Sequence, residues 1–409
     1  MTILGMPEAT IAPLVRAVAG APDRAAVAER FARAAWSLVA EPGDGDAGAL
    51  VGELGAEGAM AALIGRIRGE PVAGTAAAGT VGAAAAAIPA AALARWRPRV
   101  DPAAVQLALR QAARFGATLI VPGDEEWPAG FADLGDHAPL ALWLRGDRTR
   151  LVALRRSIAI VGARAATAYG EHVAMESAAG LVDRGVAIVS GAAFGIDGAA
   201  HRAALASDGL TVAFLAGGVD RFYPAGHDRL LRTIEERGAV VSEVPCGVAP
   251  SRWRFLQRNR LIAAASAATV VVEAGWRSGS INTANHAAQL GRPIGVVPGP
   301  ITSSASAGCH RLLRESDAIC VTTAAEMAQL LGDEVPVEVG AGAPSVTRTR
   351  LLDAMSTTTG RSPERLAVIS GLAPDRVRAE LGLLELEGQV RSRPSGWIRT
   401  VPERDRVAR

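Results

Sequence analysis

The central part of the chain alternates short apolar runs with glycine-containing turns and segments of helical periodicity. The run Ser157–Val161 is rich in β-branched residues and is followed by a glycine turn and a helical segment over Tyr169–Gly185. A second run, Val186–Ser190, leads directly into the glycine-rich segment Gly191–Asp197. Further strands are predicted at Thr211–Leu215, Ala239–Ser242, Thr269–Val272 and Pro293–Val297.

Repeated strand, turn and helix units of this kind predict a doubly wound, parallel α/β sheet. Such sheets bind ligands beyond the carboxyl ends of their strands, where helix N-termini and free backbone N–H groups point outward. The glycines and arginines of the central region fall at those ends. The pattern therefore predicts a site for an anionic ligand.

The regions on either side of the sheet have different patterns. Residues 1–118 have helical periodicity and predict an N-terminal helical domain, in which Val72–Ala94 is almost entirely small residues. That segment is expected to be a small-residue helix pair or a partly mobile stretch. A candidate strand at Ala117–Val121 opens the sheet domain, which is predicted over 119–331.

The C-terminal region predicts a separate small domain. Residues 332–347 are rich in Gly, Pro, Glu and Val without a helical period, which indicates an interdomain linker. The domain over 348–409 is expected to have helices at Arg348–Met355, Pro363–Ile369 and Pro374–Glu387 and a hairpin formed by Gln389–Ser392 and Gly396–Arg399. Three helices and a hairpin are the winged-helix form of the helix-turn-helix.

The composition excludes several kinds of catalytic chemistry, but it does not indicate which partner the protein binds. The net charge is only +2, so any basic site must be a local cluster. All 43 basic residues are arginine, which excludes a P-loop lysine and a Schiff-base lysine. The three cysteines form neither a disulfide framework nor a zinc spacing, and no signal peptide or run of about 20 strongly apolar residues is evident. We expect a soluble, cytoplasmic protein without a metal or cofactor.

The first two glycine turns supply candidate anion contacts. Gly162 allows a sharp turn, and Arg164 would place a guanidinium at the mouth of the site, where it suits a phosphate, although pairing with a surface carboxylate is an alternative. Gly191 allows close approach of the backbone to a ligand. Asp197 is expected to cap the following helix, and His201 is expected to be structural because no nucleophile accompanies it.

The segment Ser251–Arg260 is the most informative stretch, because four arginines and two aromatic residues fall within ten positions. No acidic residue occurs between Val244 and Val272. Arginines interleaved with aromatic residues are what a protein needs to bind single-stranded nucleic acid, since the charges contact phosphates and the rings stack on unpaired bases. A solvated basic loop is the alternative. A helix is expected to begin at Arg258–Arg260.

Two further loops complete the candidate site. Arg221 follows the glycine pair after the third strand, where Phe222 and Tyr223 are expected mainly to pack. Ser278, Gly279 and Ser280 follow a buried strand and precede a helix, which is the arrangement of a phosphate cup, with plain N-capping as the alternative.

Taken in order, these segments resemble the DNA-processing protein family DprA, also called Smf. The resemblance covers about 155–320 and is carried by Val161–Arg164 with Tyr169 and Gly170, Ser190–Asp197 with His201, Gly217–Pro224, Ser242–Pro245, Arg258–Ala263, Val270–Ala274, Ser278–Ser280, and Val297–Pro300 with Gly308. It implies an extended Rossmann-like domain with an N-terminal helical, SAM-like domain and a C-terminal winged helix. It also implies a homodimer that binds single-stranded DNA without sequence preference.

The family's role, as the resemblance implies it, is that of a recombination mediator. It loads the recombinase RecA onto incoming single strands during natural transformation and helps it past single-strand-binding protein. By motif position, the DNA contacts are Arg164, Gly191, Arg258, Asn259, Arg260, Ser278, Gly279 and Ser280. This chain has Ala225 where members often carry lysine and His227 where an asparagine is usual, so either one phosphate contact is lost or Arg221 replaces it.

An enzymatic alternative belongs to the same fold class. Phosphoribohydrolases that process nucleotides resemble this sheet, but their G-G-x-G-T-x-x-E motif is absent here. No Ser/His/Asp set, carboxylate pair or metal cluster stands out, so we expect no enzymatic activity. In the tail, Arg376 and Arg378 share their segment with four acidic residues, which favours a protein-contact or regulatory role over duplex DNA binding.

Overall fold

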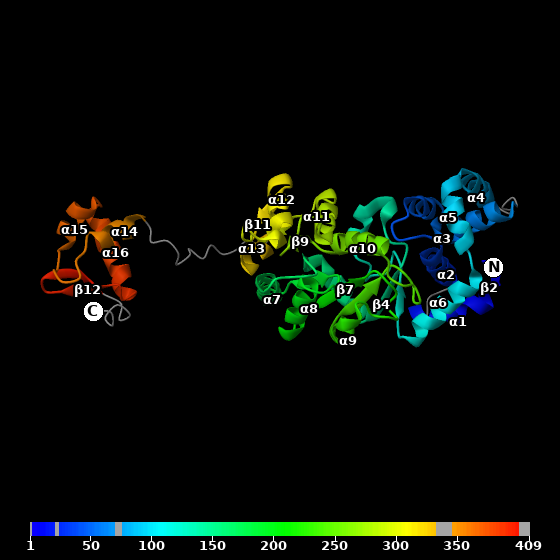
Figure 1. Cartoon of the computed structure of the whole chain (residues 1–409), viewed down its shortest axis with the longest axis horizontal. Coiled ribbons are helices and arrows are strands. Elements are labelled where there is room, and N and C mark those ends of the chain that lie inside the picture. Colours follow the sequence, from blue (N-terminus) through cyan, green and yellow to red (C-terminus); the bar gives the residue numbers. More distant parts are fainter. Residues whose placement is uncertain (1, 21–23, 70–75, 333–345, 401–409) are drawn as a thin grey trace. The chain divides into compact units, whose positions relative to one another are not determined.

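A computed structural model describes residues 2–20, 24–69, 76–332 and 346–400, and it divides into two compact units, Met1–Glu334 and Val335–Arg409 (Figure 1). The predicted linker, 332–347, falls almost wholly outside the described residues. Each unit is described by itself below.

A nine-stranded sheet forms the centre of the first unit, in the order β11-β10-β9-β5-β6-β7-β8-β4-β3. The seven strands from β5 to β11 are parallel, whereas β4 pairs antiparallel with both β8 and β3. The strands are β3 (Thr118–Ile120), β4 (Leu142–Gly146), β5 (Ser157–Val161), β6 (Ala187–Ser190), β7 (Thr211–Leu215), β8 (Ala239–Ser242), β9 (Ala268–Val271), β10 (Ile294–Val296) and β11 (Ala318–Cys320). The predicted doubly wound parallel sheet is confirmed, and β4 and β11 extend it beyond the predicted strands.

Helices cover both faces of this sheet, as doubly wound connections require. One core contains α10 (Arg252–Ala265), α11 (Gly279–Gln289) and α12 (Ala307–Glu315), and a second contains α7 (Ala168–Val182), α8 (Ile196–Ala206) and α13 (Ala324–Gln329). Figure 1 shows α10 and α11 on one face of the sheet and α7, α8 and α9 (Asp228–Arg237) on the other.

The N-terminal helices share a hydrophobic core with the β3–β4 side of the sheet. They are α1 (Glu8–Ala19), α2 (Arg24–Val39), α3 (Gly45–Arg68), α4 (Ala76–Ala87), α5 (Ala90–Trp96) and α6 (Pro102–Arg114), preceded by the short strands β1 (Thr2–Ile3) and β2 (Met6–Pro7). Trp36 and Trp96 meet edge to face at 5.3 Å in this core, which also contains Leu119 and Trp143 of the sheet. The N-terminal helices therefore pack against the sheet as part of one compact unit.

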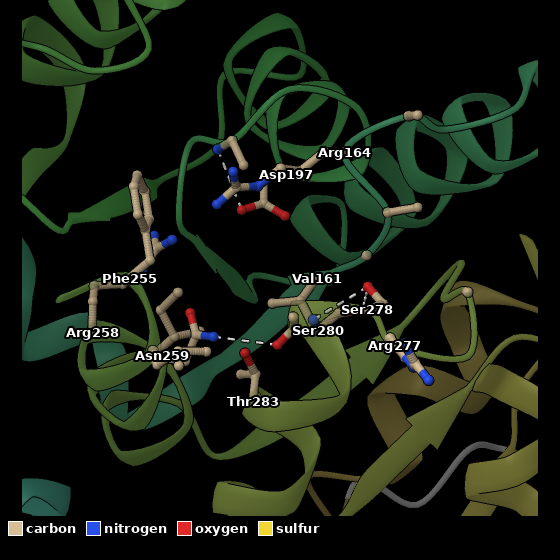
Figure 2. Close-up of a pocket in the computed structure, with 18 of the residues that line it drawn as sticks. Val161, Arg164, Asp197, Phe255, Arg258, Asn259, Arg277, Ser278, Ser280 and Thr283 are labelled. Carbon is tan, nitrogen blue, oxygen red and sulfur yellow. Dashed lines mark hydrogen bonds between the residues drawn. The ribbon is translucent and has the colours of Figure 1, made fainter. Parts of the chain in front are cut away.

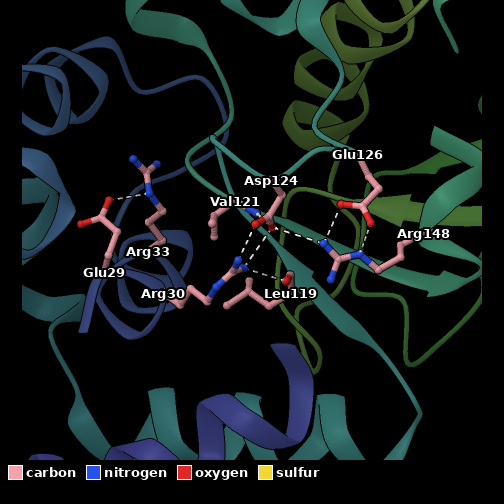
Figure 3. A network of polar contacts seen from close by, with 8 residues as sticks. All are labelled: Glu29, Arg30, Arg33, Leu119, Val121, Asp124, Glu126 and Arg148. Atoms are coloured by element: carbon pink, nitrogen blue, oxygen red, sulfur yellow. Dashed lines mark hydrogen bonds and ion pairs between the residues drawn. The ribbon is translucent and has the colours of Figure 1, made fainter. Parts of the chain in front are cut away.

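A polar network joins the same two regions (Figure 3). Arg30 of α2 forms a bidentate pair with Asp124, which follows β3 and also accepts from the Val121 amide at 3.0 Å. Arg148 approaches Asp124 at 3.7 Å and pairs with Glu126 at 2.6 Å. Because the carboxylate of Asp124 is largely buried, this pairing compensates its desolvation and fastens α2 to the sheet.

Helix α3 is long and apolar enough to cross a bilayer by length and composition. No such segment was predicted from the sequence. The backbone breaks at Gly55, where φ is 70°, and Leu50, Met60 and Leu63 on either side of the break are buried in the core. These features are those of a kinked helix within a protein core.

The second unit has its own small core. Helices α14 (Val346–Asp353), α15 (Pro363–Ser370) and α16 (Pro374–Leu386) enclose Leu351, Leu366, Val377 and Leu381, and β12 (Val390–Arg393) pairs with β13 (Gly396–Arg399). Ser362 caps α15 and Gly371 ends it in the left-handed conformation. The predicted winged-helix arrangement is confirmed.

Candidate nucleic-acid interface

A pocket of about 940 Å³ opens where the strand order of the sheet reverses. From β5 the chain proceeds through β6, β7 and β8 on one side, whereas β9, β10 and β11 lie on the other. The neighbouring strands β5 and β9 lead into Gly162 and Gly275, and both glycines line the pocket. This is the place where doubly wound sheets bind ligands.

The side chains that line this pocket carry an excess of positive charge. Four arginines and one carboxylate line it. Arg252 and Arg258 come from α10, Arg164 and Arg277 come from the loops that follow β5 and β9, and the carboxylate is that of Asp197. The lining also contains three aromatic residues, Tyr223, Phe255 and Trp276. Arg252, Arg277 and Trp276 were not predicted as site residues, although Arg252 belongs to the arginine-rich stretch and the other two directly precede the Ser278–Ser280 segment.

An aromatic and guanidinium cluster forms one side of the pocket. The guanidinium carbon of Arg164 lies 4.8 Å from the centre of the Phe255 ring, and that of Arg258 lies 5.9 Å away. Tyr223, which is 47% exposed, meets Phe255 at 5.7 Å. Of the two residues expected to pack, Phe222 is buried, whereas Tyr223 faces the pocket. Arg164, which was predicted at the mouth of the site, is exposed and lines the pocket.

Arg258 is held deeper and is almost fully buried. Its Nη1 donates to the Phe214 carbonyl at 2.6 Å, while its Nε has no partner among the described residues. Burial, with the nearby charge of Arg164, lowers the pKa of Arg258 to about 10 against the opposing charge of Asp197. The group stays cationic at neutral pH, and Figure 2 shows it among the side chains that surround the pocket.

Asp197 anchors the glycine loop rather than capping the helix as predicted. The N-cap of α8 is Gly195, with φ 73°, and the Asp197 carboxylate accepts from the amides of Gly191 at 3.1 Å and Ala193 at 3.3 Å. Burial raises the pKa of Asp197, although Arg258 and these amides act in the opposite direction. The carboxylate is therefore already engaged with the loop and is held next to Arg258.

The predicted start of the arginine helix is wrong. Helix α10 begins at Arg252, because Ser251 caps it by accepting from the Arg254 amide at 3.3 Å. Arg258 and Asn259 therefore lie in the middle of the helix, and their backbone amides are not available to an anion. The Asn259 side chain faces the pocket and donates to the Gly279 carbonyl at 3.3 Å, which links α10 to the start of α11.

Three predicted contacts do not face the pocket. Arg260 is buried in a bidentate pair with Glu243 at 2.7 Å and lies outside the pocket lining, because the helix turns it away from Arg258. Arg221 is exposed and also lies outside the lining. Gly191 lies behind Arg258, where a Cβ atom would be 1.8 Å from Nη1, so the glycine provides room for the guanidinium.

The Ser278–Ser280 segment lies between β9 and α11, as predicted, and it shows the N-capping that was the alternative to a phosphate cup. Ser278 caps α11, and its hydroxyl lies 2.7 Å from that of Ser280. All three residues line the pocket, and a Cβ on Gly279 would meet nothing within 4 Å. The positive end of the α11 dipole therefore faces the pocket beside Arg277 (Figure 2).

Neighbouring ionisable groups have structural partners. His201 is buried, and its Nδ1 lies 2.6 Å from the Thr211 hydroxyl, as expected for a structural histidine. Glu273 accepts from the amide and hydroxyl of Thr167. His227 stands where the family usually has an asparagine. Its Nδ1 lies 3.0 Å from the Ala192 carbonyl, which links it to the glycine loop.

Comparison with known proteins gives one consistent family. The family model of DNA recombination-mediator protein A matches residues 118–332, and that of the DprA winged helix domain matches residues 340–396. A DNA processing protein DprA of Mycobacterium tuberculosis is 48% identical over 318 residues, which cover 74% of this chain and 81% of that protein.

Two solved structures of DprA proteins are also similar to this chain. The X-ray structure of DprA from Streptococcus pneumoniae is 32% identical with a TM-score of 0.54, and the match covers 63% of this chain and 87% of that one. A structure of DprA from Helicobacter pylori, for which a single-stranded DNA binding mode is described, is 29% identical with a TM-score of 0.48, and the match covers 53% of this chain and 96% of that one.

Proposed function

Because the chain belongs to the DNA recombination-mediator protein A family, the DprA or Smf proteins, we propose that it binds single-stranded DNA in the pocket at the β5–β9 switch point and loads RecA onto it. The observation that carries this proposal is that four arginines and three aromatic side chains, from helix α10 and from the loops after β5, β7 and β9, converge on one pocket. The arginines would contact successive phosphates, and the rings would stack on bases.

The same geometry favours an unpaired strand over a duplex. The guanidinium carbons of Arg164 and Arg258 lie 4.8 and 5.9 Å from the centre of the Phe255 ring, so a base that stacks at this cluster would have two cationic groups near its own phosphates. The bases of a duplex are stacked on one another and cannot reach such a ring. Main-chain carbonyls, serine hydroxyls and aromatic faces do not read a base sequence, so binding would tolerate any sequence.

The proposal includes a non-enzymatic role. Asp197 is the single carboxylate among the pocket-lining residues, and its Oδ2 atom already accepts hydrogen bonds from two loop amides. The protein would act in the cytoplasm as a homodimer, presenting the strand to RecA and helping it displace single-strand-binding protein during natural transformation. Mixing the purified protein with RecA and strands coated by single-strand-binding protein tests this step. Faster RecA ATP hydrolysis would support it, and an unchanged rate would refute it.

DNA binding itself is tested by fluorescence anisotropy of labelled oligothymidylate across a salt series. With four phosphate contacts the slope of log affinity against log salt would be about −2.8, at about 0.7 per contact for single strands. Arg164→Ala and Arg277→Ala should each weaken binding and flatten the slope by about 0.7, and Arg258→Ala should do so if it stays folded by circular dichroism.

Arg221→Ala is the matched control, because this arginine is exposed and lies outside the pocket. Its affinity and slope should equal those of the unmodified protein. Equal binding by the Arg164 and Arg277 variants, or tighter binding of a duplex of the same length, would refute the proposed interface.

A further inference from the structure

Trp276 stands apart from the aromatic cluster around Phe255. It lies in the loop between β9 and α11, lines the pocket, and is 53% exposed. An indole ring is costly to leave in water, and large exposed aromatic side chains are characteristic of binding surfaces. The fold does not bury this ring, although it packs the tryptophans at 36, 96 and 143 completely.

The exposed ring is nevertheless held in place. The guanidinium carbon of Arg311, on α12, lies 5.3 Å from the centre of the Trp276 ring. Arg311 is in turn held by Glu315, one helical turn further on, with Nε 3.1 Å from the carboxylate. A cation over the ring restricts the rotation of the indole before any ligand arrives, so less conformational entropy is lost on binding.

The surroundings of Trp276 match those of a phosphate-bearing ligand. Arg277 is exposed beside it, and Ser278 caps the helix whose positive end faces the same pocket. Figure 2 shows Phe255 and Arg277 at opposite sides of the pocket. A strand that lies across the pocket from the Phe255 cluster would therefore pass the loop that carries Trp276.

From this geometry we propose that Trp276 is a second base-stacking platform, which binds an unpaired base of the same strand several nucleotides away from the Phe255 cluster. Arg311 and Glu315 act as positioning residues that hold the indole, and Arg277 contacts the neighbouring phosphate. The inference rests on the proposed binding of single-stranded DNA and adds a subsite to it. It predicts that the length of the oligonucleotide decides whether Trp276 contributes.

The test compares oligothymidylates of about 4 and about 16 nucleotides, which bracket the site sizes of single-strand-binding modules. Trp276→Leu should weaken binding of the longer strand by roughly 5- to 160-fold, the range of one lost stack, and leave the shorter strand almost unaffected. Trp276→Phe should recover part of the loss. Arg311→Met should give an intermediate loss without changing the salt slope by a full phosphate contact.

Phe115 provides the matched control, because it is also an exposed aromatic residue with an arginine over its ring, Arg114 at 5.9 Å, but it ends α6 and does not line the pocket. Phe115→Leu should bind both lengths normally.

If Trp276→Leu binds the long strand as well as the unmodified protein does, the second platform is refuted while the proposed function stands. A change in oligomeric state with unchanged affinity would also refute it, since the ring would then be a protein contact. Absence of binding by the unmodified protein would instead overturn the proposed function.

Discussion

Replacing either of two glycines, Gly191 or Gly279, by alanine should weaken DNA binding, but only the change at Gly191 should lower the stability of the fold. In Gly191→Ala the new Cβ would lie 1.8 Å from Nη1, 2.4 Å from Cζ and 2.6 Å from Nη2 of Arg258. These distances are far below van der Waals contact, and Arg258 is enclosed on its other side by its bond to the Phe214 carbonyl. The guanidinium must therefore leave its position, which breaks that hydrogen bond.

The expected cost can be worked out from those two effects. Overpacking of a tight interior typically costs about 1–3 kcal/mol, and losing a hydrogen bond to a charged group costs about 1.5–3 kcal/mol. Gly191→Ala should therefore lower the free energy of unfolding of the first unit by about 2.5–6 kcal/mol and weaken oligothymidylate binding, because Arg258 is displaced. Gly279→Ala meets no atom within 4 Å and starts a helix, so stability should be unchanged or slightly higher.

Gly279→Ala should still weaken binding, because its methyl group would stand between a phosphate and the first amides of α11. Urea unfolding followed by circular dichroism gives the stabilities, and anisotropy gives the affinities. The reasoning is refuted if Gly191→Ala unfolds at the same urea concentration as the unmodified protein, or if Gly279→Ala is the less stable of the two.

Two further outcomes follow from the structure. Burial, with nearby positive charges, lowers the pKa of His201 to about 3, below its unfolded value of about 6.5, so the folded state binds fewer protons and stability should fall by about 2 kcal/mol between pH 6.5 and pH 5. Urea unfolding at the two pH values measures this, and a His201→Gln variant with the same pH dependence would contradict it. Removing residues 335–409 should leave oligothymidylate affinity unchanged, because each unit has its own core. Duplex affinity should also persist, since Arg378 on α16 is paired with Glu364 and Asp375, and a loss in either anisotropy titration would assign the winged helix a DNA contact.

The local pattern of apolar residues in the sequence was sufficient to predict the parallel strands at the centre of the sheet. β7 and β8 occupy the predicted residues, because a short buried run of β-branched residues bounded by turns favours a strand over other local structures. β4 and β11 were missed for a physical reason. β11 is a three-residue edge strand and mostly exposed, and β4 joins the sheet antiparallel through pairing with β8, almost a hundred residues later in the chain.

The shared core of the N-terminal helices and the sheet is another feature that helical periodicity alone does not reveal. Which apolar face of a helix meets which strand depends on long-range packing, and here Trp36 and Trp143 belong to one cluster.

By itself the sequence determined the strand, glycine turn and helix units, the acid-free arginine and aromatic run, and the residue types of the phosphate cup, because these depend on neighbours within a few positions. Only the tertiary structure decided where each long side chain goes. Arg258 and Arg260 are two positions apart on one helix, yet one lines the pocket and the other pairs with Glu243. A helix turns by about 100° per residue, so such neighbours face different surroundings, and those surroundings are supplied by segments distant in the chain.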